Sequence, residues 1–213
     1  GVKTGVDREA MADDLRAAQR GEKAFPAEKY VNQIPVKKHD HVLIPAGTVH
    51  CSGANTMVLE ISATPYIFTF KMWDWGRVDL DGKPRPIHVD RGVANIQWDR
   101  NTEWVKENLV NAVTPVYEDE HTHVERTGLH EREFIDTFRV DTDKEATIHR
   151  NGSVHVMNLV DGCQAKLVST DGSFEPFEIH YAETCIIPQA AGDYKLVSED
   201  GSPVKAIIAC VRN

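Results

Sequence analysis

The chain has 213 residues, of which 27% are charged and 41% hydrophobic, and its formal net charge is -9. This length and composition are typical of a globular protein with one large or two small domains. The negative charge and the absence of a basic stripe argue against nucleic-acid binding, and no apolar run approaches the ~20 residues that span a bilayer. The four cysteines form no CxxC pair, which favours buried free thiols and a reducing, cytoplasmic setting.

The first 35 residues have a helical pattern. Asp7 can cap a helix that places Met11 and Leu15 on one face and ends near Gly21. A second short helix is expected to begin at Pro26.

Short apolar runs follow, of the kind that strands favour. They lie at Val42–Pro45, Thr56–Ile61 and Tyr66–Met72. Asn101 can cap one further helix, and the polar stretch 112–133 is interpreted as a connection between two halves.

From Phe134 onward the sequence predicts only strands and turns. Four dipeptides of the hairpin type separate short alternating strands: Asn151-Gly152, Asp161-Gly162, Asp171-Gly172 and Asp200-Gly201. This regular spacing predicts a sandwich or a jelly roll.

The two halves of the chain share a weak internal sequence similarity. The stretch HVLIPAGTVHCSG in the first half resembles TCIIPQAAGDYKL in the second, since each is an apolar run, then Pro, small residues and Gly, then another run. The second copy has Tyr194 or a neighbour where the first has His50. We therefore predict a helical segment over 1–35, a first β-unit over 36–115 and a second β-unit over 116–213.

His50 is the sharpest single candidate for chemistry. Pro45 and Gly47 would fix a tight turn just before it, so its imidazole would lie at a rigid place, and imidazole is a good ligand for a divalent transition metal. From spacing alone, a core or rim histidine is the alternative, and the residues favour it.

Other polar residues allow weaker hypotheses. The pairs His39/His41 and His121/His123 could each chelate an ion from one face of a strand, but solvated histidines fit their polar surroundings better. Glu60 interrupts an apolar run, so it is either a site residue or the partner of a nearby cation.

The densest polar and aromatic cluster lies around Lys71, Asp74 and Arg77, with two tryptophans between them. This basic set could receive an anionic substrate such as a phosphate. The alternative, which the residues alone favour, is a strand that packs its aromatic rings and pairs Asp74 with Arg77 or Lys71.

These motifs resemble the class I mannose-6-phosphate isomerases of the cupin superfamily. The resemblance rests on VLIPAGTVHCSG, MVLEIS and FTFKMWDWGRVDLDGKPRPIHVDRG, is strong over residues 36–100 and extends loosely to most of the chain. It implies a mainly β fold of two double-stranded β-helix (cupin, jelly-roll) units. By this resemblance the chain is a C-terminal part, with an incomplete metal-binding unit over 36–115 and a metal-free unit over 116–213.

The resemblance also implies one catalytic metal, usually zinc, held by a Gln, a His, a Glu and a later His. The later His matches His50, whereas the other three ligands have no match in residues 1–49 and are expected in a missing N-terminal part of the same protein. Lys71 occupies the place of the family's catalytic Arg, and it keeps the charge without the fork of donors. Glu60 and Arg77 are the expected substrate-binding residues.

The implied reaction is the metal-dependent isomerisation of mannose 6-phosphate to fructose 6-phosphate, an aldose–ketose conversion through an enediolate. Two alternatives stay open. One is a non-catalytic, sugar-binding or regulatory cupin module, because the second unit lacks the His and Lys71 replaces Arg. The other is a different metal-dependent cupin, such as another sugar isomerase or an oxygenase, for which only His39 and His41 could supply further ligands.

Overall fold

Two structural units make up the chain. The computed structural model describes residues 1–62, 69–128 and 133–212, and the units divide between Asn111 and Ala112. Within these residues, all the α-helices belong to unit 1 and all the strands to unit 2. The division predicted from the sequence, into a helical segment over 1–35 and β-units over 36–115 and 116–213, stays a prediction.

Three of the four helices in the described part of unit 1 lie where the sequence signals predict them, whereas the helix over 89–95 was not predicted. Their bounds are α1 Arg8–Gln19, α2 Ala27–Tyr30, α3 Val89–Asn95 and α4 Thr102–Asn108. The Asp7 side chain accepts from two amides of the first turn of α1, and Gly21 ends that helix at φ +75°. Asn101 caps α4 by accepting from the Trp104 amide at 3.1 Å. The predicted helices and caps are therefore confirmed.

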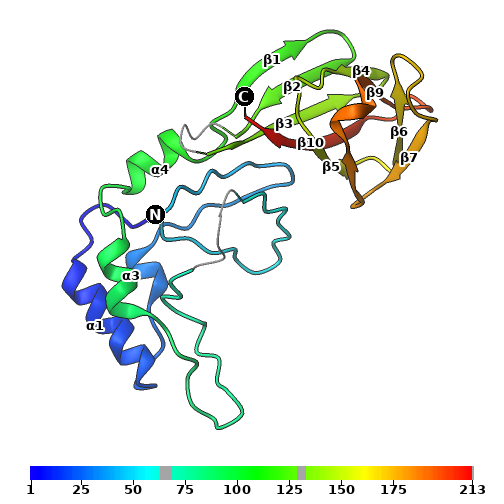
Figure 1. Cartoon of the computed structure of the whole chain (residues 1–213). Helices are drawn as coiled ribbons and strands as arrows, with labels where there is room; N and C mark the ends of the chain where they lie inside the picture. Colours follow the sequence, from blue (N-terminus) through cyan, green and yellow to red (C-terminus); the bar gives the residue numbers. More distant parts are fainter. Residues whose placement is uncertain (63–68, 129–132, 213) are drawn as a thin grey trace. The chain divides into compact units, whose positions relative to one another are not determined.

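A small hydrophobic core holds unit 1 together. Helices α1 and α3 lie side by side (Figure 1), and Arg16 of α1 pairs with Asp90 of α3 at 2.9 Å. The buried cluster beneath them consists of Val2, Met11, Leu15, Phe25, Tyr30, Ile87, Val89 and Ile96. Val49 and Met72, from the two candidate segments, pack against this cluster. The helical core thus anchors the segments that carry His50 and Lys71.

The strands predicted for the first β-unit do not form within the described residues. Val42 makes one isolated bridge with Val110, and Thr56–Ile61 has no regular structure. Of Tyr66–Met72, residues 66–68 lie outside the described residues and the remainder is not a strand. Because a strand needs a neighbour for its backbone hydrogen bonds, the apolar pattern alone gives extended chain.

The described residues of unit 2 form ten strands and one short 3₁₀ helix. The bounds are β1 Thr114–Glu118, β2 Thr122–Arg126, β3 Ile135–Thr142, β4 Glu145–Ile148, β5 His155–Asp161, β6 Gln164–Ser169, β7 Phe177–His180, β8 Thr184–Ile187, η1 Gln189–Ala191, β9 Tyr194–Val197 and β10 Val204–Val211. The stretch 112–133, predicted as a connection, instead contains β1 and β2. Its hairpin extends the sheet by antiparallel pairing of β2 with β3.

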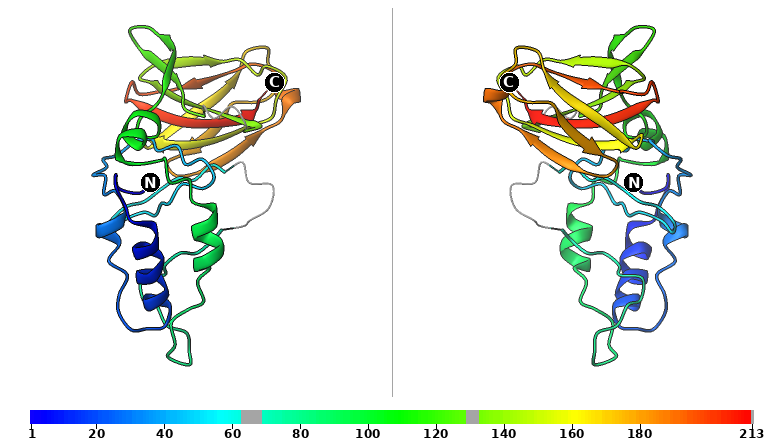
Figure 2. Two further views of the ribbon diagram at one scale, coloured as in Figure 1. Left: turned by 90° about the vertical axis from the view of Figure 1, so that its left-hand side faces the viewer. Right: turned by 90° about the vertical axis from the view of Figure 1, so that its right-hand side faces the viewer.

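The strand order of unit 2 is that of a jelly roll. One sheet runs β1-β2-β3-β10-β5-β8 and the other β4-β9-β6-β7, with antiparallel pairing throughout. Successive strands from β3 onward alternate largely between the sheets, which face each other in Figure 2. The mainly β, jelly-roll fold predicted from the sequence is confirmed for this unit.

The predicted turn dipeptides are present, but most have a different function from the one expected. Gly152, Gly162, Gly172 and Gly201 all have positive φ, between 74° and 85°. Only the Asp171-Gly172 turn joins strands that pair with each other, β6 and β7. The other three carry the chain from one sheet to the other. They are therefore corners of the jelly roll and not hairpin turns.

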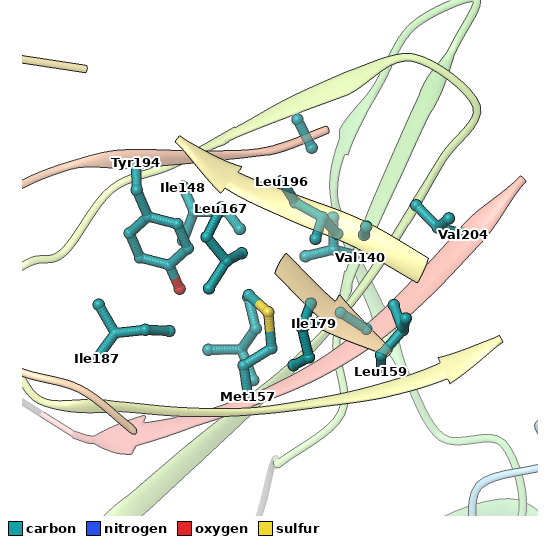
Figure 3. Packing of buried hydrophobic residues seen from close by; sticks show 14 residues of the cluster. Val140, Ile148, Met157, Leu159, Leu167, Ile179, Ile187, Tyr194, Leu196 and Val204 are labelled. Atoms are coloured by element: carbon teal, nitrogen blue, oxygen red, sulfur yellow. The ribbon is translucent and has the colours of Figure 1, made fainter. Parts of the chain in front are cut away.

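The core of unit 2 lies between its two sheets. Its largest side chains alternate with polar ones along the strands and point inward (Figure 3), as in β5, where Met157 and Leu159 are fully buried. On the edge strand β7 the predicted alternation buries only Ile179, and Phe177 is exposed. The cysteines are free, as predicted, but Cys51 and Cys163 are exposed, so the expected burial is wrong for these two.

No helix in the described part of the chain is long and apolar enough to cross a membrane.

Candidate functional site

The turn that precedes His50 is rigidly packed. The Thr48 amide donates to the Pro45 carbonyl at 3.1 Å, and the Gln97 amide donates to the Gly47 carbonyl at 2.9 Å. Gly47 has φ +81°, and a Cβ there would lie 2.8 Å from the Asn95 carbonyl oxygen. The positive φ and the close backbone approach both require glycine, which explains the Pro-Ala-Gly-Thr sequence of this turn.

His50 is held in one orientation by this turn. Its side chain is exposed, and Nδ1 lies 2.9 Å from the Thr48 carbonyl oxygen. Because a carbonyl can only accept, Nδ1 carries a proton, and in the neutral imidazole Nε2 is then the nitrogen with the lone pair. A neutral imidazole with a free Nε2 is chemically suited to accept a proton or to bind a metal ion.

Lys71 is fixed through its backbone. Its amide donates to His88 Nδ1 at 3.2 Å, and the His88 amide donates to the Lys71 carbonyl at 2.8 Å. The side chain extends into solvent with 46% of its surface exposed, and Nζ lies 3.5 Å from Asp74 Oδ2. These two hydrogen bonds with His88 fix the backbone of Lys71 and therefore the point from which its side chain extends.

Asp74 gathers three cations around one buried carboxylate. Only 9% of its side chain is exposed, and Lys71 Nζ lies at 3.5 Å while Arg77 Nη1 and Arg85 Nη1 lie at 3.7 Å from its oxygens. The predicted pairing of Asp74 with Arg77 or Lys71 is thus present, with Arg85 as a third partner. Arg85 also pairs through Nε with Asp79 at 3.3 Å, so three positive charges meet two carboxylates and an excess of one positive charge remains. We call Lys71, Asp74, Arg77 and Arg85 the Asp74 cluster.

Two tryptophans with tilted, closely spaced rings border the Asp74 cluster. The rings of Trp73 and Trp75 have centroids 4.5 Å apart, and Trp73 packs its edge against Phe25 in the core. Trp75 and Gly76 both have positive φ, 56° and 69°, in the turn that the Arg77 amide closes onto the Asp74 carbonyl. A bulky residue in this region is strained, and such strain is concentrated at functional sites.

Glu60 lies in an exposed segment. Glu60 is exposed, and the apolar run that it interrupts, Thr56–Ile61, forms no strand in the described part of the chain. The apolar neighbours are also exposed: Met57 by 84%, Val58 by 63% and Leu59 by 50%. Its assignment as a substrate-binding residue stays a prediction.

The candidate residues fall into separate groups. Lys71 and Arg77 meet at Asp74, whereas no hydrogen bond or ion pair in the described residues joins His50 or Glu60 to that cluster. Arg85 and Asp74 are eleven residues apart in the sequence and are joined by a loop. The sequence could therefore indicate a group of basic residues, but not that three of them would lie around the Asp74 carboxylate.

The histidine pairs do not build a metal site. His121 Nδ1 lies 2.8 Å from Asp143, and His123 Nε2 lies 3.0 Å from Glu125, so each imidazole pairs with a carboxylate. Across residues 1–62, 69–128 and 133–212, no group of three His, Cys, Asp or Glu side chains could hold a metal ion. The residues present therefore do not fit a complete zinc site, and His50 offers one ligand only.

The second copy of the turn motif has a different environment. Pro188 ends β8, Gly192 has φ +68°, and Tyr194 begins β9 with its side chain fully buried. Its hydroxyl lies 3.0 Å from Nδ1 of the buried His155 (Figure 3 shows Tyr194 within the core). Where the first copy presents His50 to solvent, the second directs a phenol inward as part of the core.

Comparison with known proteins identifies related isomerases. The chain is 20% identical over 172 residues to the mannose-6-phosphate isomerase ManA of Bacillus subtilis, which covers 79% of this chain and 49% of that protein. It is 32% identical over 63 residues to the mannose-6-phosphate isomerase of Streptococcus mutans, or 30% of this chain and 20% of that protein. The chain spans about half or less of the length of the curated relatives it matches.

The crystal structure of the Bacillus subtilis mannose 6-phosphate isomerase superimposes with a TM-score of 0.49 and 14% identity, over 66% of this chain and 39% of that one. No protein-family model matches the chain.

Proposed function

We propose, from the premise that this chain is a homologue of mannose-6-phosphate isomerases, that it belongs to a protein that isomerises mannose 6-phosphate to fructose 6-phosphate. The homology and the jelly-roll unit support a less specific conclusion, namely that the chain is related to isomerases and to cupins. The observation that carries the finer proposal is the cationic Asp74 cluster beside an exposed tryptophan, on the same core as the turn of His50.

The Asp74 cluster supports a role in handling an anionic sugar. With three cations against the carboxylates of Asp74 and Asp79, a negatively charged substrate group would meet an excess of one positive charge. Arg77 and Arg85 can each offer two parallel donors to a phosphate, and the face of Trp75 is available to the sugar ring. Lys71 would offset negative charge that develops on the enediolate.

The metal-dependent part of the proposal requires metal ligands in addition to His50. His50, with Nε2 unprotonated, is suited to be one ligand of a divalent ion, and zinc is the ion that the resemblance implies. Since structural and catalytic zinc sites use three or four protein ligands, the chain alone is expected to bind zinc weakly. The remaining ligands would come from the missing N-terminal part of the protein.

A non-catalytic, sugar-binding or regulatory module is the second candidate. It is favoured by the ion pair between Lys71 and Asp74, which partly neutralises the charge that catalysis would need. Tyr194, buried in the second copy of the turn, favours a structural role for unit 2.

The decisive experiment replaces Lys71 in the longest polypeptide that contains this chain. Lys71→Met should lower turnover of mannose 6-phosphate by about 10²–10³, because one preorganised electrostatic stabiliser is lost. Lys83→Met is the matched control: its side chain is 81% exposed and pairs only with Asp81, so turnover should be unchanged. Turnover is followed by coupling fructose 6-phosphate formation to a dehydrogenase assay.

Two further results complete the test. Lys71→Arg should keep or raise activity, since it restores the residue that the resemblance implies. If Lys71→Met turns over mannose 6-phosphate as fast as the parent, the catalytic role of Lys71 is wrong. Binding of the sugar phosphate without any turnover in the parent protein would favour the non-catalytic module.

A further inference from the structure

The orientation of His50 depends on a single carbonyl group. Nδ1 donates to the Thr48 carbonyl at 2.9 Å, and this is the hydrogen bond that selects the Nδ1–H tautomer. The carbonyl can do so only while the Pro45–Thr48 turn keeps its peptide planes in place. Whatever fixes this turn therefore also fixes which nitrogen of His50 is open.

Arg100 makes contacts with three groups of that turn. Its Nη1 lies 3.1 Å from the Pro45 carbonyl oxygen, 2.6 Å from the Ala46 carbonyl oxygen and 2.6 Å from Thr48 Oγ1. Thr48 is 7% exposed, so the contact with its hydroxyl is shielded from water. A charged donor on neutral acceptors makes these bonds stronger than ordinary ones.

The Arg100 guanidinium is itself held in place. It lies over the Trp104 ring, with 5.2 Å between the guanidinium carbon and the ring centroid, and Asn101 caps α4 immediately after it. Partial burial lowers the pKa of Arg100, yet an arginine stays charged at neutral pH. A fixed cation just before the N-cap of α4 thus links this helix to the turn of His50.

We propose that Arg100 is a positioning residue for His50. Through the Pro45–Thr48 turn it keeps the Thr48 carbonyl aimed at Nδ1, so that in the neutral imidazole the proton lies on Nδ1 and the lone pair on Nε2. This inference rests on the proposed function for its purpose, a basic or ligating Nε2, but its structural content concerns the tautomer alone. Arg100 and its partners in the turn are separated by 52 to 55 positions in the sequence, so no local sequence pattern predicts the contact.

The test measures the tautomer of His50 directly in the full 213-residue chain. With ¹⁵N-labelled histidine, two-bond ¹H–¹⁵N spectra above neutral pH distinguish a pyrrole-type Nδ1 from a pyridine-type Nδ1, and a His50→Gln variant assigns the signal. The parent should give the Nδ1–H pattern. Arg100→Met should lose that preference and move toward the mixture of a free imidazole.

Arg8→Met is the matched control. Arg8 also lies over a tryptophan, Trp98, at 5.2 Å, but no hydrogen bond or ion pair in the described residues joins it to the Pro45–Thr48 turn. Both substitutions remove one positive charge and one cation–π contact from unit 1. The Nδ1–H pattern should therefore persist in Arg8→Met, and Arg100→Lys, which keeps a donor at the turn, should retain part of it.

The outcomes separate this inference from the proposed function. An unchanged Nδ1–H pattern in a folded Arg100→Met protein overturns it, whatever the isomerase assay shows. If Arg100→Met unfolds unit 1, as tryptophan fluorescence would reveal, the Arg100→Lys spectrum decides: a pattern identical to the parent's contradicts the proposal. An inactive parent with the predicted tautomer change would refute only the proposed function.

Discussion

The same local pattern gives a sheet in one unit and extended chain in the other. In unit 2, the run Thr184–Ile187 pairs with β5, and Tyr194–Val197 lies between β4 and β6. In unit 1, the corresponding run at Val42 makes one bridge, and Thr56–Ile61 pairs with nothing in the described residues. Side chains follow the same division: Tyr194 is fully buried, whereas Met57 is 84% exposed.

The difference shows that pairing, and not pattern, makes a strand. An apolar run gains stability only when a neighbour satisfies its backbone groups and a second layer covers its side chains. Unit 2 supplies both, since every core strand from β3 to β10 has a partner and faces the opposite sheet. Unit 1 offers a helical core beneath, but no sheet beside these segments.

The largest expected effect contrasts two leucines. Leu159 is 0% exposed in the core of unit 2, and Leu59 is 50% exposed in unit 1. Leu159→Ala should lower the free energy of unfolding of unit 2 by about 2–5 kcal/mol, because it removes buried methyl groups and leaves a cavity. Leu59→Ala should change the stability of unit 1 by no more than about 0.5 kcal/mol.

The two units can be followed separately in urea. All four tryptophans, Trp73, Trp75, Trp98 and Trp104, lie in unit 1, so their fluorescence reports that unit, while the far-ultraviolet β signal reports mainly unit 2. If Leu59→Ala costs as much as Leu159→Ala, the exposed segment is packed in solution and the contrast between the units fails.

A smaller effect concerns pH and the buried His155. Burial and the nearby Arg150 lower its pKa to about 4, and Asp193 opposes this. Since the unfolded value is ~6.5, the unfolded chain binds an extra proton between these values, so unit 2 should lose stability as pH falls from ~6.5 to ~4. The loss attributable to this group should approach ~3 kcal/mol.

A substitution isolates that contribution from the carboxylates. His155→Gln keeps a hydrogen-bonding partner for Tyr194 but does not titrate. The measurement is the urea midpoint of the β signal at pH 7 and pH 4.5 for both proteins. The parent should lose more stability than His155→Gln, and equal losses would show that His155 does not control the pH response.

The sequence predicted those parts of the fold that depend on local chemistry. The caps at Asp7 and Asn101 and the end of α1 at Gly21 need only neighbouring backbone groups, and they lie as predicted. The glycines of the later turns were also identified, because positive φ is a local requirement. That three of those turns cross between sheets could not be predicted, since it depends on which distant strands pair.

The candidate site was predictable in composition but not in arrangement. The basic residues near Asp74 are close in sequence, so their pairing was one of two stated interpretations. The exposure of Glu60 could not be read from the pattern, because it follows from the lack of a neighbouring strand. Arg100 was missed entirely, because its contacts with Pro45 and Thr48 cross more than fifty residues.

The smallest expected contrast compares the glycines of the two turn copies. Gly47 and Gly192 both have positive φ, 81° and 68°, so alanine at either position should cost about 1–3 kcal/mol of backbone strain in its own unit. The neighbours differ. A Cβ at Gly47 would lie 2.8 Å from the Asn95 backbone carbonyl oxygen, whereas a Cβ at Gly192 would lie 3.3 Å from Oδ2 of the Asp171 side chain.

Because a carboxylate can rotate away and a backbone carbonyl cannot, Gly47→Ala should be the costlier change by about 1–3 kcal/mol. Urea unfolding measures it, with tryptophan fluorescence for Gly47→Ala and the β signal for Gly192→Ala. Gly47→Ala should also disturb His50, whose Nδ1 bond depends on the next carbonyl along, while Gly192→Ala should leave the tautomer of His50 unchanged. Equal costs in the two units would mean that the first turn is looser than its contacts with Asn95 and Gln97 indicate, and the rigidity assigned to His50 would then be wrong.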